Sequence, residues 1–414
     1  MTTLPVDSAT AATGRPPRQR ALLFVLAGNM LIDALEVSVL LVATPAVRDD
    51  LGLSLWNTQW VMSGFALGFA ALLLLGPSVT ARWGRRRVYL AALVVFVAAS
   101  VAGGLADQGL LLVLTRVVKG MCAALTAPTG LAIIGTTFRE GPEHRRAVSV
   151  YSLFGAVGFT AGLLCSGLLT GLTWRWSVVC SAPVALVLLV FALRLIPADR
   201  EPAGGEPVGG GPRLRLRPAL LLRNGPLLRS ALCAASLNGA YLGLLLLVTF
   251  QLHDELGWNS WQTALAYLPA CVPLALSLPF SGQLVGRVGT DRLIVAGLLS
   301  ATLGDALYLW RGTPDSYLTG VLPTMLLVGA GFVLSFAALN IQATSGIPAA
   351  EKRLAVPLYQ TAVQLGAVLV LPAVAALIGD HGRYRPALLL ITAVGAAGSL
   401  VALTGVRRRP RTDA

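Results

Sequence analysis

The sequence predicts an all-α integral membrane protein with twelve transmembrane helices in two six-helix bundles. The 414-residue chain is 55% hydrophobic and only 12% charged, whereas a water-soluble domain carries about 25% charged residues. Twelve apolar runs recur along the chain. Each run is close to the roughly 20 residues that a helix needs to cross a ~30 Å hydrocarbon layer. A polar stretch divides the runs into two equal sets.

The first set follows a short, polar and basic start. Its six expected helices are 21–46, 58–79, 88–105, 109–134, 148–170 and 177–196. Residues 1–20 are expected to form a cytoplasmic tail and not part of a signal peptide, because the run after them is too long and carries acids. The six runs predict an N-terminal bundle at 21–196.

The second set predicts a C-terminal bundle at 228–406, with a cytoplasmic tail at 407–414. Its six expected helices are 228–251, 262–284, 293–310, 316–342, 355–379 and 386–406. Residues 197–227 between the two sets are rich in Pro, Gly and charge. That composition is typical of a linker, here expected in the cytoplasm.

The basic residues set the expected orientation. Of the 32 Lys and Arg, 25 lie at the termini, in the linker and in the alternate loops on the same side, five lie in the opposite loops, and two lie inside an apolar run. The positive-inside rule then places both termini in the cytoplasm. Most of the eight Trp cluster near the opposite boundary. We therefore expect a multi-pass protein of the plasma (inner) membrane.

Composition and motifs argue against several other classes of protein. The formal charge of +13 is spread over short loops and forms no single stripe, which argues against a nucleic-acid partner. The five Cys show no metal or redox spacing. We find no phosphate-binding loop and no Ser/His/Asp grouping, so we expect no enzyme and no bound metal. Repeated polar rings, which a channel would need, are also missing.

Two oppositely charged pairs lie where charge is costly. Asp33 and Glu36 share the run 21–46, and Arg116 and Lys119 share the run 109–134. Each pair has i, i+3 spacing, so its members lie on one face of a helix. An ionisable group inside a bilayer costs several kcal/mol unless it is paired or hydrated, so such residues indicate a functional site. A further acid, Asp305, lies toward the outer end of the run 293–310.

Other polar positions within the runs are candidates for a substrate cavity. Gln360 and Gln364 share a helix face at i, i+4 spacing. The full set of candidates is Asn29, Tyr241, Gln251, Asn340, Tyr359, Gln360 and Gln364. Each is equally suited to a hydrogen bond between helices. Their mixture of amide and aromatic groups suits an amphipathic organic molecule.

An internal repeat links the two halves. After the second run the chain reads PSVTARWGRRR (77–87), and after the eighth it reads GQLVGRVGTDR (282–292). In both segments an Arg follows the first position by five residues and a Gly follows it by seven. Six-helix halves with matching turns predict a parallel repeat, the architecture of transporters that rock two bundles around a midplane site.

Three further segments resemble those of a known family. The segment LTRVVKGMCAALTAPTGLAII (114–134) and the following FREGPEHRRAVSVYSLFGAVGFTAGLLCSGLL resemble the drug:proton antiporter branch of the major facilitator superfamily. ALEVSVLLVATPAV (34–47) extends the resemblance, with Glu36 in the acidic position and Pro45 nine residues later. Members of this branch commonly have fourteen helices, and this chain lacks the extra central pair.

The resemblance implies roles for individual residues. It implies proton coupling by Glu36 and Arg116, which match family positions. Asp33 and Lys119 join them as charges inside the same two runs, although the family more often has Gln at the position of Lys119. The resemblance also implies an inner gate at Arg82, Gly84, Arg85 and Arg86, and close helix packing in the antiporter motif at Gly162 and Gly167. We expect Glu36 to be the main proton carrier and Asp33 a secondary acid, with Arg116 paired to both acids and Lys119 tuning the pair.

The chain departs from the family pattern at its turns. Pro77 replaces a Gly of the inner-turn motif, Ala81 replaces its Asp, and Gly286 takes the acidic place in the second half. The gate must therefore close with less help from charge. In the antiporter motif, Gly162-Leu163 and Ser166-Gly167 stand where the family has Gly-Pro and Gly-Gly.

We therefore expect a secondary active transporter that exports an amphipathic organic compound, a drug or natural product, in exchange for protons by alternating access. It would need no cofactor beyond the proton gradient, and its partners would be a small organic substrate, protons and the lipid bilayer. We expect it to act as a monomer. Uptake or facilitated transport of a metabolite is one alternative, and a transport-inactive membrane sensor with the same fold is another.

Overall fold

The structure, a computed structural model, describes residues 17–137, 142–196, 224–277, 287–312, 316–379 and 383–406. All regular structure within these ranges is helical. The linker expected at 197–227, apart from its last four residues, lies outside the described residues, as do Gly286, residues 1–16 and the tail 407–414. The last four residues of the expected N-terminal tail, 17–20, are instead the first residues of a helix.

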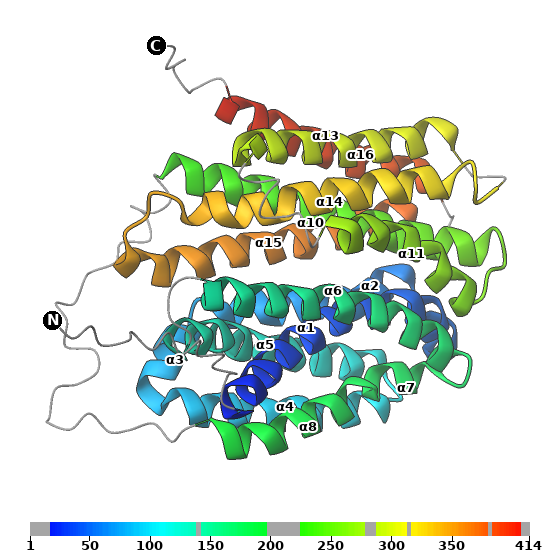
Figure 1. The fold of residues 1–414 in the computed structure, drawn as a ribbon. Coiled ribbons are helices and arrows are strands. Elements are labelled where there is room, and N and C mark those ends of the chain that lie inside the picture. The colour runs from blue at the N-terminus through cyan, green and yellow to red at the C-terminus, as the bar shows by residue number, and fades with distance from the viewer. Residues whose placement is uncertain are drawn as a thin grey trace, which may run out of the picture.

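The described part of the first half contains eight helices. They are α1 (Pro17–Leu51), α2 (Leu55–Leu73), α3 (Gly76–Trp83), α4 (Arg85–Gly104), α5 (Gly109–Thr137), α6 (Pro142–Thr170), α7 (Trp174–Val179) and α8 (Ser181–Leu195). The described part of the second half contains α10 (Gly225–Asp254), α11 (Ser260–Ser277), α13 (Thr290–Arg311), α14 (Val321–Thr344), α15 (Ala349–Ile378) and α16 (Tyr384–Val406). Figure 1 shows the two halves lying one on the other, with α10 to α16 above α1 to α8.

Each of the twelve predicted helices has a counterpart. Within the described ranges, ten spans are long and apolar enough to cross a membrane, and the bent pair α2–α3 makes eleven. The twelfth, α11, is described only as far as Ser277, and the rest of its predicted run lies outside the described residues. The chain therefore has the predicted all-α membrane fold.

Two predicted helices are broken, and proline explains both breaks. The run 58–79 divides into α2 and α3 with a bend of 59°, and the run 177–196 starts inside α7 and continues as α8. A proline lacks the N–H that would bond to the carbonyl four residues earlier, and its ring clashes with that carbonyl. Accordingly α2 ends at Leu73, four residues before Pro77, and α7 ends at Val179, four residues before Pro183.

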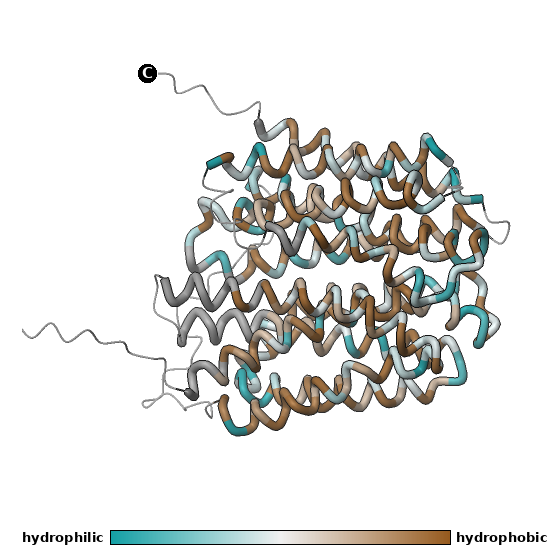
Figure 2. The backbone as a smooth tube through the Cα atoms, turned by 45° about the vertical axis from the view of Figure 1, so that its right-hand side comes forward, coloured by the Kyte–Doolittle hydropathy of each residue, from teal (hydrophilic) through white to brown (hydrophobic). Residues whose placement is uncertain are grey.

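The helices run between two polar ends. We call them the Arg48 end, where α1 ends, and the Arg82 end, where α3 lies. In Figure 2 hydrophobic residues cover the middle of the helices, and hydrophilic residues gather at the two ends. α1 begins and α16 ends at the Arg82 end (Figure 1). This arrangement is that of a bundle that crosses a bilayer.

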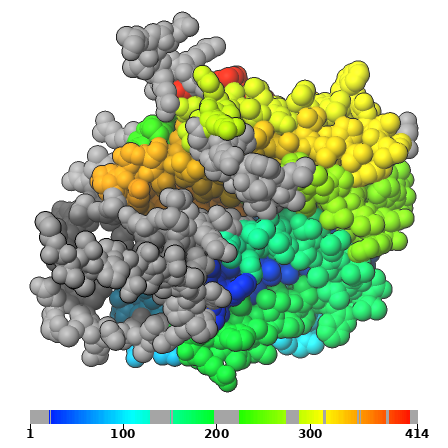
Figure 3. Space-filling view, viewed as in Figure 1, coloured from blue at the N-terminus to red at the C-terminus, as the bar shows by residue number. Residues whose placement is uncertain are grey.

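Among the described side chains, the halves share a hydrophobic core toward the Arg48 end. There Leu41 of α1, Met62 of α2 and Leu163 of α6 pack in a single cluster with residues of α10, α11 and α15. Toward the Arg82 end the described residues form separate cores, one around Tyr89 in the first half and one around Leu298 in the second. Figure 3 shows the second half lying directly on the first at the right of the view, which is the Arg48 end. The structure is therefore closed at the Arg48 end.

The internal repeat appears in the backbone. Gly84 has φ 84° and ψ 143° and begins α4, and Gly289 has φ 85° and ψ 151° and begins α13. A positive φ with such a ψ is open almost only to glycine. The two glycines that match in the repeat therefore make the same turn in the two halves.

Candidate functional site

The intramembrane charges of the first half meet in one buried cluster. Helices α1 and α5 run in opposite directions, and Glu36 of α1 contacts both cations of α5. Its Oε2 pairs with Nη1 of Arg116, and its Oε1 lies 2.6 Å from Nζ of Lys119. All three residues are at most 1% exposed. The structure thus brings together Glu36, Arg116 and Lys119, three of the four charged residues that the sequence analysis expects to meet.

Arg116 holds three helices together. Its Nη2 donates to the backbone carbonyl of Glu36 at 2.9 Å, and its Nε donates to the carbonyl of Val61 in α2 at 3.0 Å. Its guanidinium also lies 5.0 Å from the ring centre of Phe65. A guanidinium presents its donors in a fixed plane, so these contacts set the position of α1 against α2 and α5.

Lys119 connects the cluster to the break between α7 and α8. Its Nζ donates to the carbonyl of Val178 and to the hydroxyl of Ser181, each at 3.2 Å. It also lies 4.9 Å from the ring centre of Phe96. Sequence reasoning missed Val178 and Ser181. Pro183 was the available signal, because a proline in a predicted span can break the helix.

Asp33 is not part of the ion-pair cluster, so the prediction that Arg116 pairs with both acids holds for Glu36 only. Since α1 and α5 are antiparallel, Arg116 lies beyond Glu36 toward the Arg48 end, whereas Asp33 lies one turn toward the Arg82 end. Asp33 is half-buried, and its Oδ2 has no hydrogen-bond partner among the described residues. It is a separate acid beside the cluster.

Three of the predicted cavity residues are engaged in the packing of the helices. Gln251 donates to Glu255 at 2.9 Å and accepts from the hydroxyl of Tyr308 at 2.7 Å. Asn340 donates to the carbonyl of Phe336 in its own helix. Asn29 is buried and accepts from Tyr89 at 3.4 Å, while its amide nitrogen has no partner in the described part of the chain. Gln251 is therefore a structural residue in this state.

The other four predicted cavity residues lie on α10 and α15. The ring of Tyr241 lies 6.3 Å from that of Phe159 in the first half and 4.9 Å from that of Phe332 in α14. Tyr359 is buried, and its hydroxyl lacks a partner within the described ranges. Gln360 and Gln364 are half-buried on α15.

The predicted gate residues divide into two groups. Arg82 and Arg85 are exposed, whereas Arg86 donates to the carbonyl of Leu193 at 2.9 Å and so ties the start of α4 to the last turn of α8. Gly162 lets α6 approach α1, because a Cβ there would lie 2.1 Å from the Ser38 hydroxyl.

Gly167 allows a similar approach across the halves. A Cβ on Gly167 would lie 2.8 Å from the Cβ of Ala264 in α11. The backbone of α6 therefore lies close against α11 near the Arg48 end, and a larger residue at position 167 would separate the two halves there.

A polar network across the halves at the Arg48 end was missed by sequence reasoning. Arg48 of α1 donates to both carboxylate oxygens of Asp254 in α10, at 3.1 and 2.7 Å. His253 lies 3.3 Å from Asp49, and the hydroxyl of Tyr384 donates to Asp254 at 3.4 Å. We call these five residues the Arg48 network. They lie in three helices far apart in the sequence, so no local pattern revealed them.

Comparison with known proteins identifies the family. The model of the Major Facilitator Superfamily matches residues 26–371. The chain belongs to this superfamily. Solved structures agree with the fold. A mutant of the nucleoside transporter NupG superimposes with a TM-score of 0.74 at 13% identity, covering 93% of this chain and 99% of that one. A bacterial homologue of the human lysosomal transporter Spinster gives 0.72 at 17% identity, covering 96% and 98%.

Several curated relatives are named as resistance or export proteins. The puromycin resistance protein pur8 of Streptomyces alboniger is 32% identical, over 92% of this chain and 87% of its own length. The cephamycin export protein CmcT of Amycolatopsis lactamdurans is 28% identical, over 94% and 90%. The tetracenomycin C resistance and export protein of Streptomyces glaucescens is 25% identical, over 87% and 76%. These names agree with the drug-exporting branch that the sequence resembles, and the matched superfamily is one of transporters rather than enzymes.

Proposed function

We propose that this major facilitator transporter exports an amphipathic organic compound in exchange for protons, by alternating access. The buried cluster of Glu36, Arg116 and Lys119 carries the proposal. Ionisable side chains inside a membrane bundle are costly to bury, and those that are present mark proton or substrate pathways. The resistance and export relatives support the direction and the class of substrate. No cofactor beyond the proton gradient is needed, and a single chain suffices.

The proposed orientation places the Arg48 end outside the cell and the Arg82 end in the cytoplasm, together with both terminal tails and the linker. It rests on the distribution of Lys and Arg. In this orientation the described state is closed to the outside. The shared core and the Arg48 network on one side, and the separate cores on the other, support this assignment.

The proton site is the pair of Glu36 and Lys119, with Arg116 as the fixed charge. A lysine can lose its proton when buried, whereas an arginine keeps its charge. In the described state Glu36 is a carboxylate held by both cations. When the outer side opens, a proton added to Glu36 weakens the hold of both cations on α1. The two residues titrate as one coupled pair.

Asp33 provides the path toward the cytoplasm. It lies one turn from Glu36 on the side of the Arg82 end, and its Oδ2 has no partner among the described residues. A proton leaving Glu36 therefore meets a free carboxyl oxygen on its way inward. We propose that substrate binds at faces of the second half that include Tyr241, Tyr359, Gln360 and Gln364.

Transport assays on inside-out vesicles test this proposal. With an acidic lumen, vesicles carrying the protein should accumulate at least one compound of a panel that includes puromycin, cephamycin and tetracenomycin C. An uncoupler should abolish the accumulation, and vesicles with Glu36→Gln should show none. Accumulation that ignores the uncoupler across the panel would overturn proton coupling. Accumulation only in right-side-out vesicles would favour uptake, and no movement of any compound would favour the sensor.

A further inference from the structure

A second buried acid lies in the other half of the molecule, outside the cluster of Glu36. Asp305 of α13 is 2% exposed, and its Oδ1 has no hydrogen-bond partner within the described ranges. No cation of the described chain forms a salt bridge with it, although such pairs occur elsewhere. An ionised carboxylate without a partner in a low-dielectric interior costs several kcal/mol. In this state Asp305 is therefore a neutral, protonated acid.

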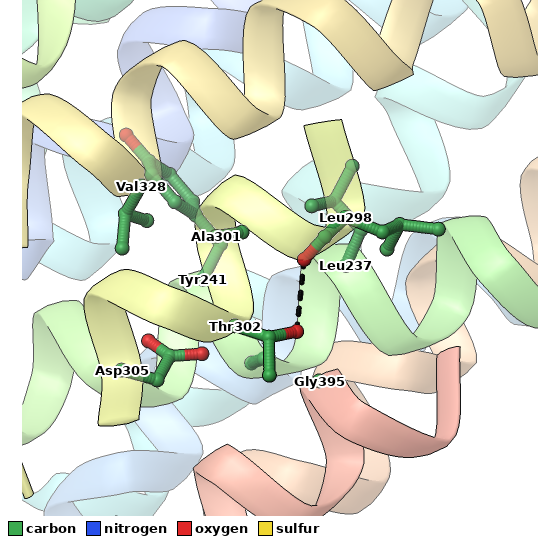
Figure 4. A pocket seen from close by; sticks show the side chains of 9 residues that line it. Leu237, Tyr241, Leu298, Ala301, Thr302, Asp305, Val328 and Gly395 are labelled. Atoms are coloured by element: carbon green, nitrogen blue, oxygen red, sulfur yellow. Dashed lines mark hydrogen bonds between the residues drawn. The ribbon is translucent and has the colours of Figure 1, made fainter. Parts of the chain in front are cut away.

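The carboxyl group of Asp305 faces a small cavity (Figure 4). The cavity measures about 10 Å³, which is room for about one water molecule. It exists because residue 395 is a glycine: a Cβ there would lie 3.3 Å from Oδ2 of Asp305 and 3.0 Å from the hydroxyl of Thr302. Thr302 itself donates to the carbonyl of Leu298 at 2.8 Å. A water in this cavity can accept the proton of Asp305.

The helices around Asp305 contribute no charged side chain to the cavity within the described residues. Tyr241 comes from α10, Val328 from α14 and Gly395 from α16. One turn further along α13, the hydroxyl of Tyr308 is engaged by Gln251. The charge of Asp305 therefore depends on water reaching it, rather than on a fixed counter-charge.

Tyr241 connects this cavity to the contact between the halves. Its ring lines the cavity and also packs against Phe332 and, across the halves, Phe159 of α6. A substrate that binds between the halves near Tyr241 must displace part of this packing. Movement of the ring opens the cavity to water, and hydration favours the ionised form of an acid.

We propose that Asp305 is a second proton-binding site, which carries its proton into the described state and releases it when substrate displaces Tyr241. The O–H bond of Asp305 breaks, and the proton passes to water on the cytoplasmic side. Asp305 takes up a new proton after the Arg48 end opens. It lies six residues, or about 9 Å along α13, from the end of that helix at the Arg48 end. The coupling part of this inference rests on the proposed function, whereas the protonation of Asp305 does not.

Infrared spectroscopy of the purified full-length protein in lipid nanodiscs tests the protonation. At pH 7 the wild type should show the carbonyl band of a protonated carboxylic acid, and Asp305→Asn should lose one component of it. Asp305→Glu should keep a shifted component, and Asp33→Asn should leave the Asp305 component in place. An Asp305→Asn spectrum identical to that of the wild type, from protein that elutes as a single species, would overturn the proposal.

Accumulation in vesicles tests the coupling. Without a membrane voltage, each coupled proton multiplies the limiting accumulation of substrate tenfold for each unit of pH difference. Loss of one proton in Asp305→Asn should therefore lower the slope of the logarithm of accumulation against pH difference by one, while accumulation stays sensitive to the uncoupler. An unchanged slope with loss of the infrared band would overturn the coupling and leave Asp305 a neutral packing residue. A wild type that ignores the uncoupler would count against the proposed function, and the infrared result would still decide whether Asp305 holds a proton.

Discussion

At the scale of single residues, the charge balance of the buried cluster governs the properties of the site. One carboxylate contacts two cations, so the cluster carries a net positive charge when Lys119 is protonated. Removing one partner from a buried ion pair costs about 3–5 kcal/mol, because the other charge is left without compensation. Substitutions here must therefore be compared with variants that restore the balance.

Glu36→Gln is expected to abolish transport driven by a proton gradient while leaving substrate binding and exchange. The amide keeps the shape of the side chain but cannot titrate, and it leaves two buried cations unpaired. The protein should also melt at a lower temperature, and Glu36→Gln/Lys119→Gln, which removes one cation, should regain part of that stability without regaining coupling. Vesicle transport and thermal unfolding measure the two effects. Normal gradient-driven transport by Glu36→Gln would reject Glu36 as the proton carrier.

Asp33→Asn is the matched comparison on the same helix. Because Asp33 has no ion-pair partner among the described residues, the change should leave stability near that of the wild type and reduce transport less than Glu36→Gln does. Transport rate and substrate affinity, measured on the same vesicles, separate a role in the proton path from one in binding. An inactive Asp33→Asn together with an active Glu36→Gln would make Asp33 the main proton carrier and Glu36 the secondary acid.

Arg116 and Lys119 are expected to differ in their effects on the pH profile of transport. Arg116→Ala removes contacts to α1 and α2, so it should leave almost no activity, while Arg116→Lys should retain part of it. Lys119→Gln leaves the pair of Glu36 and Arg116 intact, so it should stay active with a shifted pH optimum. A profile for Arg116→Ala that matches the wild type would make these residues structural only.

At the scale of the helices, sequence patterns predicted the spans better than their breaks. Apolar runs identify the twelve helices because the bilayer imposes a minimum length on each. Helices break before Pro77 and Pro183, but Pro45 lies inside the continuous helix α1, so a proline in an apolar run does not by itself predict a break. The contacts of Lys119 at the break between α7 and α8 depend on that break, so they could not be predicted from spacing on α5 alone.

The same limit applies to the acids of α1. Their i, i+3 spacing places Asp33 and Glu36 on one face, but it does not say which neighbour each one meets. The antiparallel course of α5 decides that Glu36 receives both cations. The sequence repeat, by contrast, predicted a backbone feature well, because glycine is almost the only residue that adopts the turn at Gly84 and Gly289.

Gly84→Ala and Gly289→Ala are expected to destabilise the protein by similar amounts, about 1–3 kcal/mol each, because both residues have a positive φ that alanine rarely adopts. Gly225→Ala is the control, since a Cβ there meets nothing within 4 Å and φ is not positive. Thermal unfolding in detergent measures the effect. Equal midpoints for Gly84→Ala and Gly225→Ala would contradict the strained turn.

At the scale of the whole molecule, the two halves are held together at one end by a shared core and a small polar network. Alternating access requires this contact to break in every cycle. Arg48 and Asp254 are only partly exposed, at 23% and 34% of their side chains. Such pairs contribute about 0.5–1 kcal/mol. A contact of that strength favours closure of the outer side without preventing its opening.

Breaking the pair of Arg48 and Asp254 is therefore expected to expose the contact between the halves more often. Ala264 is fully buried beside Gly167 in the described state, so a cysteine at position 264 should react with an impermeant thiol reagent only when the outer side opens. Arg48→Ala or Asp254→Ala should raise its labelling rate in intact cells by about two- to fivefold, the equivalent of 0.5–1 kcal/mol.

The double variant should react no faster than the faster single one, because the two residues share one interaction. Arg311→Ala, which removes an exposed charge at the same end, should leave the rate unchanged, and the parent without the introduced cysteine sets the background. Labelling that is equal in all variants would show that the shared core alone closes the outer side.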